Sequence, residues 1–213
     1  VDDEENILVG GIQDGVVVRP QDERLLVSLA VSFSEERLLA LEGARRFKGL
    51  SLPLSRLRQY FFSPTISVRF SPDPDLDVIP TQASAQLAIR IVPEMRPDDI
   101  FDKLRRHLDD DGYPDIELRL VSGYPGARVE LAEPVVQSMV ETYRLHGYEP
   151  QILPLSASAS PYYLFTEILG IPYVWGGLGK AGRSHAPDEY ATVEGLRQFE
   201  KSIATFIYTF ANR

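Results

Sequence analysis

The sequence predicts an α/β fold made of two modules that meet near residue 123. Within residues 81–120, an alternating strand, an amphipathic helix and a second alternating strand follow one another. This order is typical of an open sheet with a helix on one face. After residue 124 the pattern changes to helix, strand, helix, strand, helix. A chain of 213 residues is long enough to bury a substantial core.

The composition is that of a globular protein and excludes several functions. Hydrophobic residues make up 44% and charged residues 25%, and the formal net charge is -9. This acidity argues against binding to nucleic acids or to anionic membranes, since both require a basic face. Cysteine is absent, which removes disulfides, thiolate zinc sites and cysteine nucleophiles. The acidic N-terminus does not resemble a signal peptide, and no apolar stretch could span a bilayer, so we expect a soluble, cytoplasmic protein.

Residues 1–64 are the least regular part, and we expect helices joined by loops there. Pro20 precedes an acidic turn and an apolar stretch, which could begin a helix. Ser34 is a good N-cap for a second helix, because two glutamates follow it in the first turn.

Residues 65–122 carry the clearest alternation. Apolar residues occupy every second position over 83–91, which predicts a strand with one buried face. Pro97 is suited to the first position of a helix, and Gly112 would end that helix. A second strand is expected over 116–120, where Ile, Leu and Leu alternate with charged residues.

Residues 123–213 are expected to contain three helices and two short strands. The first helix runs from Pro134 to Gly147 and the second from Pro161 to Gly170, with strands at 152–155 and 172–175. The last helix has an apolar stripe that we expect to lie in the core. It consists of Leu196, Phe199, Ile203, Phe206, Ile207 and Phe210.

His185 is the histidine with the strongest case for a functional role. It lies in a glycine-rich loop after an expected buried strand, where α/β proteins often bind ligands. His107 and His146 each come near the end of a helix, where a solvated ring stabilises the helix dipole. The spacing Gly177-x-Gly179-x-x-Gly182 matches a dinucleotide fingerprint only formally, because no helix begins directly after it.

A serine-rich run precedes Pro161 and contains Ser158. Its hydroxyl or N–H groups could bind a ligand at the start of a helix. A flexible turn without a ligand is the simpler interpretation of the same run.

Residues 184–189, Ser-His-Ala-Pro-Asp-Glu followed by a long final helix, resemble the C-terminal signature of a metallopeptidase family. This is the two-zinc amidohydrolase family of aminoacylases, glutamate carboxypeptidases, acetylornithine deacetylases and carnosinase-like dipeptidases. Residues 78–93 resemble the strand that enters the family's lid, or dimerisation, domain. Residues 2–9 and 22–24 resemble the long lid insertion of the dipeptidase-like branch, so the resemblance covers nearly the whole chain.

The resemblance implies a helical lid insertion at 1–64, a lid module at 65–122 and the C-terminal part of an α/β zinc-peptidase catalytic domain at 123–213. His185 would bind zinc, and Ser158, Gly177 and Gly179 would line the substrate cleft. The intact enzyme would use two zinc ions, or cobalt or manganese, to hydrolyse dipeptides or N-acyl amino acids with metal-activated water.

The family's other metal ligands come from an N-terminal catalytic half that is not identifiable in these residues. We therefore expect no hydrolysis by the 213 residues alone. The alternative hypothesis is a non-catalytic module that forms a homodimer through the sheet edge of residues 81–121. A serine hydrolase using Ser158 and His185 is a third reading, although the sequence lacks a nucleophile elbow.

Overall fold

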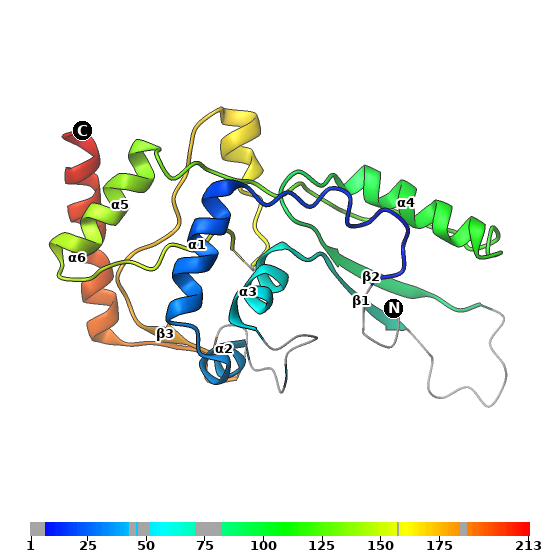
Figure 1. Ribbon diagram of the computed structural model, residues 1–213, viewed down its shortest axis with the longest axis horizontal. Coiled ribbons are helices and arrows are strands. Elements are labelled where there is room, and N and C mark those ends of the chain that lie inside the picture. Colours follow the sequence, from blue (N-terminus) through cyan, green and yellow to red (C-terminus); the bar gives the residue numbers. More distant parts are fainter. Residues whose placement is uncertain (1–6, 43–45, 47–51, 71–81, 157, 184–186) are drawn as a thin grey trace. The chain divides into compact units, whose positions relative to one another are not determined.

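The computed structural model describes residues 7–42, 46, 52–70, 82–156, 158–183 and 187–213. The chain forms two compact units, each described here by itself. The N-terminal unit comprises Val1–Ala127 and Leu153–Pro161, and the C-terminal unit comprises Arg128–Ile152 and Tyr162–Arg213. Figure 1 shows mixed secondary structure, in which helices predominate and the paired strands are short.

Three helices open the N-terminal unit: α1 (Pro20–Val31), α2 (Glu35–Glu42) and α3 (Pro53–Phe62). The expected helix starts near Pro20 and after Ser34 are confirmed. Helix α1 begins at Pro20, where the missing N–H leaves no hydrogen bond unmade. One hydrophobic cluster joins α1 to α3, with Leu26 fully buried among Leu57, Phe61 and Phe62.

A two-stranded antiparallel sheet and one helix complete the N-terminal unit. Strand β1 (Thr65–Phe70) pairs with β2 (Ala85–Arg90), and helix α4 (Pro97–Asp110) follows. The predicted start of α4 at Pro97 is confirmed. Gly112, just beyond its end, has a φ of 87°, a left-handed conformation that favours glycine.

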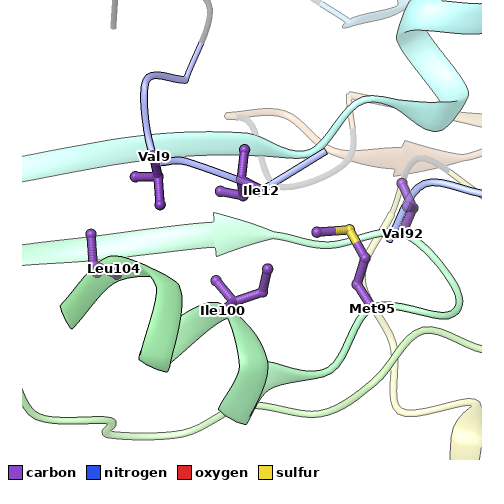
Figure 2. Packing of buried hydrophobic residues seen from close by; sticks show 6 residues of the cluster. All are labelled: Val9, Ile12, Val92, Met95, Ile100 and Leu104. Carbon is purple, nitrogen blue, oxygen red and sulfur yellow. The ribbon is translucent and has the colours of Figure 1, made fainter. Parts of the chain in front are cut away.

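The second hydrophobic cluster lies between the N-terminal segment and α4 (Figure 2). Its buried members are Val9, Ile12, Val92, Met95, Ile100 and Leu104. Burial of the α4 residues agrees with the apolar stripe that the sequence shows on this helix.

The C-terminal unit contains α5 (Pro134–Leu145), a π-helix η1 (Leu164–Leu169), strands β3 (Ala181–Gly182) and β4 (Tyr190–Ala191), and α6 (Val193–Ala211). The expected stops at Gly147 and Gly170 are confirmed, since both glycines have positive φ. Helices α5 and α6 pack against each other.

The strands expected over 116–120, 152–155 and 172–175 do not form in the structure. The first of these segments is held by Arg105 on α4. Its guanidinium donates hydrogen bonds to the carbonyls of Ile116 (2.5 Å) and Tyr113 (3.0 Å). The one open sheet expected from 81–120 is therefore replaced by the β1–β2 pair.

The prediction that the apolar stripe of α6 lies in the core is wrong, because four of its six side chains are exposed. Leu196, Phe199, Ile207 and Phe210 are between 46% and 60% exposed. The buried positions of α6 are instead Gly195, Ser202 and Thr209, spaced seven residues apart. Small residues at this spacing lie on one helix face and allow close approach to a neighbour.

The division into residues 1–64, 65–122 and 123–213 stays a prediction, and the two compact units divide the chain differently. Among the residues that the structure describes, no helix is both long and apolar enough to cross a membrane.

Candidate functional site

The glycine loop at residues 176–179 is held by hydroxyl groups from two helices. The Tyr143 hydroxyl on α5 donates to the carbonyl of Gly177 (2.8 Å) and accepts from the Gly177 N–H (3.1 Å). On α6, the Ser202 hydroxyl accepts from the N–H of Leu178 (3.1 Å). Two successive peptide units are thereby fixed to the α5–α6 pair.

Glycine is required at position 177 for two reasons. Its φ is 137°, in the region that L side chains rarely adopt. A Cβ there would also lie 2.9 Å from Cε2 of Phe199, which is closer than real Cβ contacts. The backbone therefore approaches the Phe199 ring as only glycine allows.

The base of the loop that contains His185 is also well defined. Strands β3 and β4 pair antiparallel through Ala181↔Ala191 and Gly182↔Tyr190. One step further out, the N–H of Thr192 donates to the Lys180 carbonyl (3.0 Å). The same threonine caps α6, because its hydroxyl accepts from the Gly195 N–H at 3.0 Å.

Arg183 and Asp188 stand on either side of the segment that carries His185. Both have left-handed backbones, with φ of 59° and 61°. Their side chains form an exposed ion pair at 3.3 Å. His185 itself lies outside the described residues, so its predicted role as a metal ligand stays a prediction.

Ser158 lies in the N-terminal unit, in an exposed turn. Its hydroxyl is 2.7 Å from that of Ser156, and its N–H donates to the Ser156 hydroxyl at 3.2 Å. Such local bonds are typical of serine turns. The two serines therefore satisfy each other's hydrogen bonds without a ligand. The predicted role of Ser158 in substrate binding stays a prediction.

The other two histidines have local partners. His107 is 3.7 Å from Asp111, one turn further along the chain at the end of α4. The Nε2 atom of His146 lies 2.9 Å from the Thr205 hydroxyl, which links the end of α5 to α6. Both rings therefore have a polar neighbour within their own unit.

Tyr173 anchors the extended segment that leads into the glycine loop. Its ring stacks on that of Tyr162 with centroids 4.7 Å apart. Burial raises the pKa of the Tyr173 hydroxyl, and the neighbouring Tyr162 raises it further. Trp175 follows two residues later, is 67% exposed and is the single tryptophan of the chain.

The described residues do not by themselves fit a metal site. They contain no group of three or more histidine, cysteine, aspartate and glutamate side chains placed to hold an ion. A catalytic zinc ion typically takes three protein ligands plus water. His185, which lies outside the described residues, would add one donor.

The sequence did not indicate that Tyr143 and Ser202 hold the glycine loop. Tyr143 looked like one more apolar position on α5, although its hydroxyl needs a partner wherever the ring is buried. A signal for Ser202 was present in the spacing of Gly195, Ser202 and Thr209, which marks the close-packed face of α6.

Neither the family models nor the curated protein sequences that were searched give a match to this chain. Solved structures do match. An M20 family metallo-carboxypeptidase, Sso-CP2 from Sulfolobus solfataricus, has a TM-score of 0.79 and 24% identity over 99% of this chain. The dipeptidase Dug1p from Saccharomyces cerevisiae has a TM-score of 0.82 and 18% identity over 100% of it.

Human carnosine dipeptidase 1 also matches the whole chain, with a TM-score of 0.77 and 21% identity. The 213 residues span about half of each solved structure: 49% of Sso-CP2, 47% of Dug1p and 48% of the human enzyme. At these identities the likeness establishes the fold. The chain therefore has, along its whole length, the fold of part of an M20 metallopeptidase.

Proposed function

We propose that the chain is the lid and C-terminal part of a zinc-dependent amidohydrolase or dipeptidase that cleaves dipeptides or N-acyl amino acids. The observation that carries the proposal is the similarity of the whole chain to three metallopeptidase structures, two of which are described as dipeptidases. The His-Ala-Pro-Asp-Glu block at 185–189 supports it independently. In this proposal residues 1–64 are the lid insertion, 65–122 the lid module and 123–213 the catalytic part.

His185 is the zinc ligand that this chain supplies, and cobalt or manganese are the alternative metals. A neutral imidazole is a common ligand of zinc. Ser158, Gly177 and Gly179 contribute to the substrate cleft. In this proposal the remaining metal donors belong to polypeptide outside the 213 residues, since these residues span about half of each similar structure. The proposal therefore predicts no hydrolysis by the 213 residues alone.

Two features of the structure agree with a chain that needs further polypeptide. Segments 116–120 and 172–175 have strand-like sequences but no strand partner among the described residues. The apolar side of α6 is also exposed, with Leu196 and Ile207 at 57% and 60%. Monomeric proteins rarely leave large contiguous apolar surfaces in water.

The test uses the complete protein encoded by the gene. We expect it to hydrolyse dipeptides or N-acyl amino acids, to lose activity with a chelator and to regain it with zinc. The variant His185→Ala should lose both activity and bound zinc. The matched control His107→Ala should keep both, since its ring lies at the end of α4, near the carboxylate of the capping residue Asp111. Activity that is indifferent to chelation, or a His185→Ala variant with full zinc content, would contradict the proposal.

A second candidate function is homodimerisation through the β1–β2 sheet. One face of this sheet carries Val68, Phe70 and Leu87, which are 45%, 76% and 37% exposed. Within the described residues each strand has a single strand partner, and strands at the edge of a sheet favour pairing with another chain. Light scattering should give the mass of a dimer, and Phe70→Lys should shift the protein toward monomer. A strict monomer at high concentration would rule this candidate out.

A further inference from the structure

Buried hydroxyls on α5 and α6 are used in two different ways. Those of Ser138, Thr142 and Thr209 donate to carbonyls four residues earlier in their own helices. Tyr143 and Ser202 instead bond to the backbone of the glycine loop, which is 34 and 24 residues away in sequence. The helix pair therefore has two hydroxyls whose bonds fix a loop.

Each of these two hydroxyls donates one hydrogen bond and accepts one. Tyr143 donates to and accepts from the same residue, Gly177. Ser202, which is 1% exposed, donates to the Phe199 carbonyl at 2.8 Å and accepts from Leu178. A hydroxyl with one donor and two acceptor positions is well satisfied by such a pair of bonds.

The peptide groups on either side of this fixed pair are available to a ligand. Gly176 and Gly179 are exposed, and within the described part of the chain neither has a backbone hydrogen bond. Exposed, rigidly held N–H and C=O groups bind a ligand with little loss of entropy, because the loop is already ordered.

We infer that Tyr143 and Ser202 are positioning residues, which hold the Gly177–Leu178 backbone so that the flanking glycine peptides are preorganised for substrate. This inference rests on the proposed function, in which Gly177 and Gly179 line the substrate cleft. Neither hydroxyl touches substrate. Their removal should therefore weaken substrate binding more than the chemical step.

The loop geometry is tested first in the 213-residue chain, where no activity is needed. Tyr143→Phe and Ser202→Ala each remove one hydroxyl. Thr142→Val is the matched control, because this buried threonine bonds only within α5. Amide hydrogen exchange of Gly177 and Leu178 and the fluorescence anisotropy of Trp175 report on the loop.

We expect exchange at Gly177 in Tyr143→Phe, and at Leu178 in Ser202→Ala, to rise roughly fivefold or more over the control variant. Trp175 anisotropy should fall in both variants and stay unchanged in Thr142→Val. Exchange and anisotropy equal to those of the control would overturn the inference, since the two hydroxyls would then only stabilise the helix pair.

The consequence for substrate is tested in the complete protein. KM for a dipeptide or N-acyl amino acid substrate should rise about tenfold in Tyr143→Phe and Ser202→Ala, with kcat changed much less. Thr142→Val should keep the KM of the unmodified protein. Active variants with unchanged KM would contradict this inference, whereas an unmodified protein without any hydrolysis would contradict the proposed function.

Discussion

Gly195, at the start of α6, gives the sharpest prediction about the base of the His185 loop. A Cβ at this position would clash with the backbone N of Lys180 and lie 2.7 Å from the Thr192 hydroxyl. The first clash is with backbone, so no side-chain rotation relieves it. In Gly195→Ala, α6 and the residues leading into β3 must move apart.

The magnitude follows from two opposing effects. Alanine at an unhindered helix position stabilises by about 1 kcal/mol relative to glycine. Overpacking costs about 1–3 kcal/mol, and contacts this short belong at the upper end. The net loss is therefore about 2 kcal/mol, or roughly 4–8 °C in Tm for a chain of this size.

Thermal and urea unfolding followed by circular dichroism measure this effect. Gly10→Ala is the matched control, because no atom lies within 4 Å of a Cβ at Gly10 and its φ is not in the left-handed region. We expect the control to leave Tm unchanged or slightly raised. If Gly195→Ala behaved like Gly10→Ala, the close approach of α6 to Lys180 would be refuted.

Two further predictions concern the two units separately. Leu26→Ala should destabilise the N-terminal unit by about 2–5 kcal/mol, because the side chain is fully buried between α1 and α3. Urea unfolding measures the loss in the free energy of unfolding. A loss below about 1 kcal/mol would contradict this packing. In the C-terminal unit, the raised pKa of Tyr173 favours the neutral hydroxyl in the folded state. The contribution of this hydroxyl to stability is therefore fully present below the pKa of an unfolded tyrosine, about 10, and is lost as pH rises through the pKa of Tyr173 in the folded state. Tyr173→Phe should reduce this alkaline loss in a urea titration against pH, and an identical pH dependence in both proteins would contradict burial of the hydroxyl.

Most helix boundaries could be predicted from sequence because local chemistry determines them. The start expected at Pro161 is wrong, since the helix there, η1, begins at Leu164. Pro97 and Pro134 both begin helices at the first helical position, where no backbone N–H is needed. Gly147 and Gly170 end helices in left-handed conformations that disfavour other residues. These features require no knowledge of tertiary contacts.

Strands were predicted less well because alternation shows which faces are apolar but not whether a partner strand exists. Residues 116–120 alternate, yet no strand lies beside them among the described residues and none forms there. Strand β1 was not predicted, although Ile66, Val68 and Phe70 alternate with polar residues. The α6 stripe shows the same limit, since it marks a surface suited to burial without showing what covers it.

The candidate site was predicted in part. The sequence pointed to the glycine loop, and the structure shows Gly177 in a conformation that requires glycine. The hydroxyls of Tyr143 and Ser202 could not be assigned to this loop from sequence, because their bonds to it span 34 and 24 residues. Only folding brings such distant groups together.

The central claim is that His185 coordinates a metal ion whose other protein ligands lie outside these 213 residues. The most direct test is a crystal structure of the complete protein grown with zinc, with anomalous diffraction measured at the zinc absorption edge. We expect a zinc peak about 2.0–2.1 Å from a ring nitrogen of His185. Zinc bound elsewhere, with the His185 ring in an apolar interior away from any metal, would contradict it.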